Sequence, residues 1–303
     1  HHRGKTMLQF LIDTLIRTAD LSLVALGLSL VYGLVRFANI AHMQYAMVGS
    51  FITAAGLRLG MPLALAIVFS ALVCGMLSMI LHHWVYQPLL KSGTANAMIG
   101  SLAVSMVLIA LVLGVEGSAP VNYSLPVGAL LQVGDTRISS DELWGLGVTI
   151  SLVVVFSLLL FRTPQGRAIR ALASNRDLAA ASGLNASAII HTVNLLAGML
   201  AAVGGSMLAM NASAWVNQGN DLMLPVLAAA ILGGLGNPMG AIFGALLIAA
   251  TETLVTNIDW SWLFGGDLLF IPVTWVNASS FVILLLALLL RPYGLFNREV
   301  RRV

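Results

Sequence analysis

Residues 94–115 of the chain read TANAMIGSLAVSMVLIALVLGV and contain no charged side chain. A helix needs about 20 mostly apolar residues to cross the hydrocarbon core of a bilayer, and this run is long enough. Residues 143–161 and 268–290 are uncharged runs of the same kind. Strands of membrane barrels instead alternate apolar and polar residues over about 10 positions, and these runs do not. The pattern predicts an all-α polytopic membrane protein.

The composition supports the same class. Of the 303 residues, 59% are hydrophobic and 9% are charged, and the mean hydropathy is +0.94. Soluble domains carry about 25% charged residues, so a soluble enzyme is excluded. A disordered chain is excluded because the apolar content is too high. We expect residues 1–6 to be the remnant of a tag or linker and residues 7–303 to form a single transmembrane domain.

About eight hydrophobic segments divide the chain. They lie near residues 19–35, 37–57, 63–82, 94–115, 143–161, 189–211, 222–257 and 273–290. Residues 7–16, ahead of the first segment, are broken by Asp13 and followed by Arg17 and Asp20. We therefore expect residues 7–16 to form an amphipathic helix on the membrane surface.

The charges between the segments predict an orientation. Residues 116–142 and 257–271 are mainly acidic, whereas residues 162–188 and the tail 291–303 carry four arginines each. Cytoplasmic loops carry an excess of Lys and Arg. We expect the arginine-rich segment 162–188 and the C-terminus to lie in the cytoplasm, and the loop 116–142 to lie outside.

Two of the hydrophobic segments are interrupted. Residues 222–257 must enter and leave on the same side, and their middle, 233–238, reads GGLGNP, which breaks a helix. Residues 19–57 are interrupted in the same way around 36–42, RFANIAH. An interrupted helix in each half is typical of a transporter whose substrate site lies between the two halves. The alternative is that glycines only allow close helix packing, which we expect of Gly240 and Gly244.

These interruptions supply the candidate residues of the substrate pathway. They are Asn39, His42, Gln44, Gly233, Gly234, Gly236, Asn237 and Glu252. Glu252 is a carboxylate at membrane depth, where an ionisable group is a functional candidate by default. It is expected to face the pathway or to pair with Arg36 or His42; the alternative is contact with water at the outer interface. Arg36 either anchors an anionic substrate group or extends to lipid headgroups.

Residues 162–188 are predicted to form a pair of short helices. Thr163 and Asn175 are N-cap residues, Pro164 suits a first helical position, and Gly183 suits a helix stop. A helical pair with four arginines is either a docking surface for a soluble partner or an ordinary positively charged loop at the lipid headgroups.

Four stretches carry a family resemblance. They are GLSLVYGLVRFANIAH (27–42), RTPQGRAIRALASNRDLAAASGLN (162–185), AAAILGGLGNPMGAIFGALLIAATETL (228–254) and RPYGLF (291–296). With them the chain resembles the permease subunits of high-affinity ABC importers for branched-chain amino acids, and their relatives for urea and short amides. It departs from the family at Met43 and Gln44, where a glycine and an acidic residue are usual.

The resemblance implies a location in a prokaryotic cytoplasmic (inner) membrane, in contact with the membrane lipids. The implied protein partners are a homologous second permease in a heterodimer, one or two ABC ATPase subunits and an extracytoplasmic substrate-binding protein. The resemblance also implies that the helical pair docks into the ATPase. The coupling residues expected are Arg167, Arg170, Asp177, Ala180, Ala181 and Gly183.

The residues indicate no chemistry in this chain. Neither of the two lysines, Lys5 and Lys91, lies in a phosphate-binding loop, so we expect ATP and Mg²⁺ to be used by the partner subunits only. No catalytic, metal or nucleic-acid site is expected. The predicted function is the pathway subunit of an importer for branched-chain or other amino acids, with a urea or short-amide permease as alternative. A passive urea or water channel is a third possibility, although Asn-Pro occurs only once; an ion-coupled carrier usually has more membrane carboxylates than Glu252.

Overall fold

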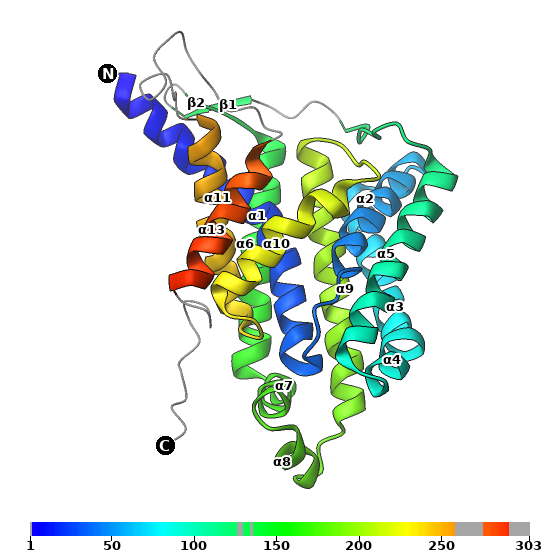
Figure 1. The fold of residues 1–303 in the computed structure, drawn as a ribbon. Coiled ribbons are helices and arrows are strands. Elements are labelled where there is room, and N and C mark those ends of the chain that lie inside the picture. Colours follow the sequence, from blue (N-terminus) through cyan, green and yellow to red (C-terminus); the bar gives the residue numbers. More distant parts are fainter. Residues whose placement is uncertain (1, 126–129, 134–135, 258–274, 291–303) are drawn as a thin grey trace.

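The computed structural model describes residues 2–125, 130–133, 136–257 and 275–290. Helices run through nearly all of this part (Figure 1). The elements of the first half are α1 (His2–Val35), α2 (His42–Arg58), α3 (Leu63–Leu81), the π-helical turn η1 (His82–Tyr86), α4 (Gln87–Lys91) and α5 (Thr94–Glu116). Those of the second half are β1 (Leu130–Val133), β2 (Thr136–Ser139), α6 (Ser140–Arg162), α7 (Pro164–Ser174), α8 (Arg176–Ala181), α9 (Ala186–Asn211), α10 (Gln218–Gly233), α11 (Pro238–Asn257) and α13 (Val276–Leu290).

Six helices among the described residues are long and apolar enough to cross a membrane. They are Leu8–Val35, Leu63–Lys91, Thr94–Glu116, Ser140–Arg162, Ala186–Asn211 and Pro238–Asn257. Helices α2 and α10, with 17 and 16 residues, are only about 25 Å long at 1.5 Å per residue, which is less than the roughly 30 Å of a hydrocarbon core. The prediction of an all-α polytopic protein is confirmed, and the count of about eight hydrophobic segments, broken helices included, stays a prediction.

The ribbon has two distinct ends. The hairpin of β1 and β2, an antiparallel pair, lies at one end, and α7 and α8 lie at the other (Figure 1). We call the second the α7–α8 end. The expectation of a cytoplasmic C-terminus concerns residues 291–303, which lie outside the described residues.

Helix α9 lies at the centre and packs closely against its neighbours because small residues line it. A Cβ on Gly198 would lie 2.6 Å from the carbonyl oxygen of Cys74 in α3, and one on Gly204 would lie 2.9 Å from Val24 in α1. Glycine at such points lets helix backbones approach, which is how membrane helices associate without a hydrophobic driving force. The outward faces of α3, α5 and α6 carry large exposed apolar side chains suited to lipid.

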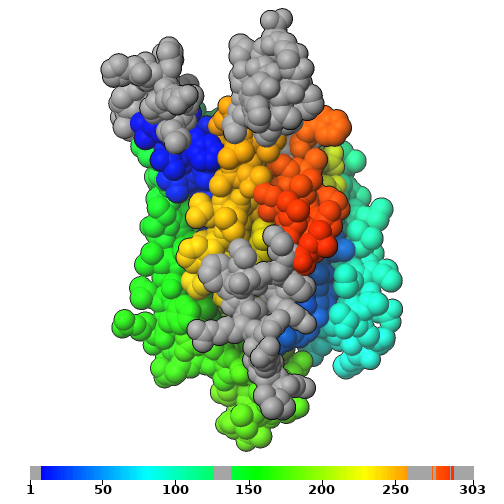
Figure 2. Space-filling view, turned by 60° about the vertical axis from the view of Figure 1, so that its left-hand side comes forward, coloured from blue at the N-terminus to red at the C-terminus, as the bar shows by residue number. Residues whose placement is uncertain are grey.

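The expectation of a surface helix over residues 7–16 is wrong. Helix α1 runs without a break from His2 to Val35. The charges that suggested a surface position find partners on α11: Asn257 donates to Asp13 at 3.2 Å, and Arg17 donates to Glu252 at 2.6 Å. Because these side chains are paired, the part of α1 from Asp13 to Arg17 can pack against α11. Figure 2 shows the N-terminal part of α1, in blue, beside α11, with α13 next to α11 on the same face.

The predicted interruption at residues 233–238 is confirmed. Helix α10 ends at Gly233 and α11 begins at Pro238, and the two form a V whose arms both run toward the hairpin end (Figure 1). Gly234 and Gly236 have φ of 91° and 90°, a conformation that residues with a Cβ rarely adopt. The predicted close packing of Gly240 and Gly244 is also confirmed, since each lies directly against the backbone of α10.

The interruption in the first half is confirmed as well. Helix α1 ends at Val35 and α2 begins at His42. Arg36, the residue that follows α1, has φ of 62° and is the non-glycine residue with positive φ in the described part of the chain. The chain then turns back toward the hairpin end as α2 (Figure 1).

Candidate functional site

The two interruptions touch each other. A Cβ on Gly33 would lie 3.2 Å from the carbonyl oxygen of Gly236, and one on Gly236 would lie 3.1 Å from the Cα of Gly33. These distances are shorter than an ordinary van der Waals contact, so the backbones are in direct contact. Segments some 200 positions apart in sequence therefore meet at one place in the molecule.

His42 is buried and bonded to the backbone. It is 1% exposed, and its Nε2 donates to the carbonyl oxygen of Val24 in α1 at 3.1 Å. Gly27 provides the space, since a Cβ there would lie 3.1 Å from the imidazole Cε1. In this conformation His42 ties the first turn of α2 to α1.

Buried polar groups gather near the first interruption. The side chains of Asn39, Tyr45 and Tyr86 are buried and lie close enough to interact with one another. Tyr86 packs on Phe37 with ring centroids 5.6 Å apart, and Tyr45 packs on His42 at 5.8 Å. Buried polar groups nearly always have a partner, and these three side chains can supply one another with it.

A polar seam continues from there between α2, α9 and α10. The side-chain amide of Gln44 donates to the side-chain oxygen of Asn220 at 3.0 Å. The hydroxyl of Ser50 donates to the side-chain oxygen of Gln218 at 2.8 Å. We define the polar seam by its six members, Gln44, Ser50, Thr53, Ser206, Gln218 and Asn220. All these side chains are uncharged amides or hydroxyls, and five of the six are buried.

Sequence reasoning found only Gln44 in this seam. Ser50 and Thr53 lie one turn apart on α2, and Ser206 faces them from α9, where it pairs with Thr53 at 2.8 Å. Small hydroxyl residues at helical spacing in a membrane segment are the signal that would have found them.

The expected partners of Glu252 are wrong. Glu252 accepts from Arg17 at 2.6 Å and from Ser280 at 2.5 Å, and is 2% exposed. Arg36 and His42 are elsewhere, at the first interruption. The carboxylate joins α11 to α1 and α13, so it holds helices together rather than lining the contact between the interruptions.

Glu252 is not the single membrane carboxylate that the sequence suggested. Asp20, which was assigned to the region around a surface helix, is 6% exposed within α1. It lies one helical turn after Arg17, which acts on it electrostatically, and its side chain interacts with that of Asn211 in α9. Buried carboxyl groups need such compensation within the protein.

The second interruption stabilises its own turn. The Asn237 side chain accepts from the Gly240 backbone N–H at 3.1 Å, and the Asn237 N–H donates to Gly234 at 2.9 Å. Asn237, Gly233 and Gly234 thus have structural contacts within the V of α10 and α11.

The predicted helical pair at residues 162–188 is confirmed as α7 and α8. Thr163 accepts from the Gly166 N–H at 3.1 Å, and Asn175 accepts from the Leu178 N–H at 3.0 Å, so both predicted caps exist. Gly183 has φ of 84° and ends α8, as expected. The caps hold two short helices at a sharp angle, and these project from the bundle (Figure 1).

The tip of this pair is open to a partner. Asp177, Ala180, Ala181 and Gly183 are all exposed. Leu178 beside them is 64% exposed, which is unusual for a leucine outside the lipid-facing helices. Arg167 is exposed, whereas Arg170 stacks over the ring of Phe161 at 5.0 Å and so belongs to the base of the pair.

Arg36 connects the pair to the first interruption. Its guanidinium donates to the carbonyl oxygen of Ala173, in the last turn of α7, at 3.0 Å. The sequence suggested a substrate anion or a lipid headgroup as the partner of Arg36; the structure places it on the α7 backbone instead.

No group of three histidine, cysteine, aspartate or glutamate residues in the described part of the chain is arranged to hold a metal ion. The arrangement offers uncharged hydrogen-bonding groups at a contact between two interrupted helices. Together with the spanning helices, it defines a membrane transport protein.

Comparisons with known proteins identify the family. The family model described as "Branched-chain amino acid transport system / permease component" matches residues 10–290. The high-affinity branched-chain amino acid transport system permease protein BraD of Pseudomonas aeruginosa is 28% identical over 98% of this chain and 98% of that protein. The probable branched-chain amino acid transport permease protein LivH of Methanocaldococcus jannaschii is 30% identical over 93% of this chain and 90% of that protein. The chain belongs to this family of permease components.

A solved structure entitled "PsaBC from Streptococcus pneumoniae in complex with Fab" aligns over 92% of this chain and 91% of that chain, with a TM-score of 0.49 and 16% identity.

Proposed function

We propose that the chain is one half of the membrane pathway of an ATP-driven importer that moves branched-chain amino acids into the cell. The observation that supports this is a connected path through the fold. The α7 backbone bonds Arg36, Arg36 begins the first interruption, and that interruption touches the second at Gly33 and Gly236. A signal from a partner at the α7–α8 end therefore has a physical route to the place where the two halves meet.

The mechanism proposed is alternating access. Asn39, His42 and Gln44 are buried, which fits a closed pathway. When a partner moves α7 and α8, the pull on Arg36 separates Gly33 from Gly236 and exposes the polar seam. Bistable packed contacts of this kind turn a small displacement into opening or closing. The chain contributes a two-state pathway and no covalent chemistry.

The partners of the mechanism are also proposed. ATP and Mg²⁺ are bound by separate ATPase subunits that dock on the exposed tip of α8, a homologous second permease forms the other half in a heterodimer, and a binding protein delivers substrate from outside. The family of the chain and the exposed small residues of the tip support this. The setting is the cytoplasmic membrane of a prokaryote, with the α7–α8 end inside.

The substrate class follows from the family and the seam. Both relatives named above are described as permeases for branched-chain amino acids. An uncharged seam of amides and hydroxyls suits a solute without net charge, such as a zwitterionic amino acid. Urea and short amides meet the same description, so the experiment must separate them.

The experiment is reconstitution. The chain is expressed with its neighbouring transport genes, purified through a tag, and its companions are identified; the complex is then placed in liposomes. Radiolabelled leucine should accumulate only with ATP and the binding protein, and a variant of the ATPase that cannot hydrolyse ATP should abolish uptake. Accumulation of urea but not leucine under the same conditions would select the amide permease. Purification without partners, with passage of urea or water that needs no ATP, would identify a passive channel and refute the proposal.

A further inference from the structure

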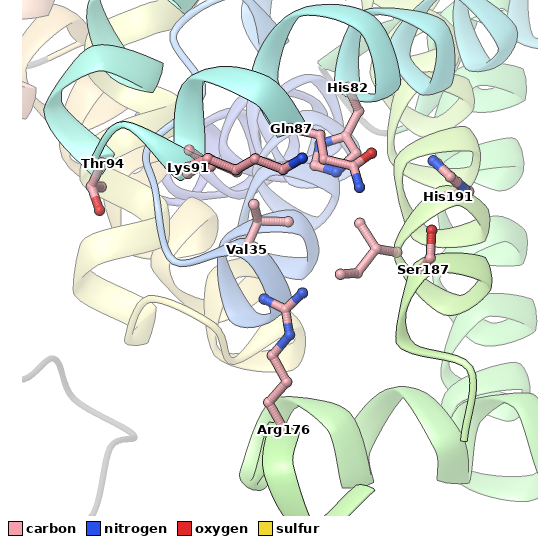
Figure 3. Close-up of a pocket in the computed structure, with 10 residues that line it drawn as sticks. Val35, His82, Gln87, Lys91, Thr94, Arg176, Ser187 and His191 are labelled. Carbon is pink, nitrogen blue, oxygen red and sulfur yellow. The ribbon is translucent and has the colours of Figure 1, made fainter. Parts of the chain in front are cut away.

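A basic pocket lies at the α7–α8 end, away from the polar seam. Its volume is about 420 Å³, and α1, η1, α4, α8 and α9 contribute to its walls. Figure 3 shows that the side chains from these elements surround a common space. Its polar lining includes His82, Gln87, Lys91, Arg176, Ser187 and His191.

The charged groups of this basic pocket have one sign. Lys91 from α4 and Arg176 from α8 extend toward the pocket from opposite sides (Figure 3). No aspartate or glutamate lines the pocket, and neither cation forms an ion pair among the described residues. Two cations that face one space without a counter-charge repel each other, so an anion between them stabilises the arrangement.

Imidazoles extend the same surface. The rings of His82 and His191 have centroids 6.2 Å apart, and those of His83 and His191 are 5.2 Å apart. This cluster does not qualify as a metal site in the described part of the chain. Neutral or protonated, an imidazole N–H can donate to an anion.

The wall of the basic pocket also holds unused hydrogen-bonding capacity. The Nδ1 of His82 and the Oε1 of Gln87 are buried without a partner among the described residues, and His82 is 3% exposed. His82 belongs to the π-helical turn η1 and Gln87 is the residue after it, and π-helical turns are frequent at functional sites. A ligand with both an anion and hydroxyl groups would use the histidine, the cations and the amide oxygen together.

The position of the basic pocket selects the source of the anion. The candidate span Leu63–Lys91 ends at the pocket, and Trp84 of η1, 74% exposed, lies where interface tryptophans anchor a helix at the headgroups. Basic pockets between helices at the cytoplasmic side of a membrane, where the proposed function puts the α7–α8 end, bind anionic headgroups. A soluble anion could reach the same cations from water, but its binding would not require a pocket at the depth of the lipid headgroups.

We propose that the basic pocket binds the phosphate of an anionic phospholipid headgroup, held between Lys91 and Arg176. The lipid links α4 to the first residue of α8 and so fixes the base of the helical pair. The pocket includes no member of the polar seam, so lipid binding can be measured without the transported solute.

The test measures lipid retention by the full-length protein. The purified permease is titrated with phosphatidylglycerol or with phosphatidylcholine and examined by native mass spectrometry. Wild type should retain one phosphatidylglycerol in preference to phosphatidylcholine. Lys91→Ala and Arg176→Ala should each weaken retention about tenfold, as expected for loss of a charged hydrogen bond. Lys91→Arg should restore it, and Arg162→Ala, which removes one exposed arginine outside the pocket, should leave it unchanged.

Several results would overturn the proposal. Equal retention of phosphatidylglycerol and phosphatidylcholine by wild type overturns it. This comparison needs no variant, so it tests the proposal even if the alanine variants fail to fold. Complete displacement of the lipid by an excess of inorganic phosphate shows a soluble-anion site. Alanine variants that keep the lipid but lose the ATPase subunits show that the cations contact a protein partner.

Discussion

Substitutions at Arg36 can distinguish an effect on the link between the helical pair and the first interruption from an effect on the stability of the fold. Its φ of 62° costs about 1 kcal/mol or more for a residue with a Cβ. Its hydrogen bond to Ala173 is exposed and contributes about 0.5–1 kcal/mol. Arg36→Ala loses the bond and keeps the strain, so it should destabilise by about that amount. Arg36→Gly loses the bond and relieves the strain, so its stability should remain within about 1 kcal/mol of wild type.

Both variants should lose the connection to α7. In liposomes that contain the complete importer, we expect the amount of leucine taken up per ATP hydrolysed to fall severalfold in both, while the thermal unfolding midpoint falls only in Arg36→Ala. Arg58→Ala is the matched control, because it removes an exposed arginine whose 2.7 Å bond to Glu116 lies far from α7. Wild-type uptake per ATP in Arg36→Gly would refute the route through Arg36. A loss of uptake that follows stability across the series would also refute it.

Three further predictions concern other contacts. Glu252→Leu should lower the free energy of unfolding by about 2–3 kcal/mol because it leaves Arg17 unpaired. Glu116→Gln breaks an exposed pair and should lower it by less than about 1 kcal/mol. Thermal unfolding in detergent measures both, and similar values would contradict the buried role of Glu252. Ala180→Trp should leave unfolding unchanged and abolish ATPase capture on affinity beads, so normal capture would refute docking at the tip. Asn175→Ala should weaken the start of α8 by about 1 kcal/mol and speed amide exchange there, with no change in α10.

Local signals predicted the interruptions and the helical pair correctly. Glycines and a proline at 233–238 break a helix whatever surrounds them, and Thr163 and Asn175 cap the helices that begin beside them. These features depend on residues only a few positions apart, so the sequence contains the whole cause. The family resemblance, which rested on the same stretches, was correct for the same reason.

Long-range pairing is where prediction from the sequence failed. Arg17 and Glu252 are 235 positions apart, and nothing near either residue identifies its partner. Without that pair, the charges of residues 13–20 look incompatible with a membrane helix, and the start of α1 was misjudged. The polar seam was missed because Ser, Thr and Gln satisfy one another across three helices, an arrangement that packing decides.

The two interruptions differ in a way that assigns them different parts in the proposed motion. The second consists of residues that adopt its turn easily, and the backbone N–H groups of Gly234, Asn237 and Ala241 donate to carbonyl oxygens within it. The first contains a strained arginine whose side chain donates to the backbone of α7. Strained residues persist only where neighbouring contacts hold them. A displacement of α7 that pulls on Arg36 through this bond lets the strained backbone there change conformation, whereas the second interruption has no strained residue of this kind. In the proposed motion, the first interruption is therefore the moving part of the pathway, and the V of α10 and α11 is the fixed surface against which it opens.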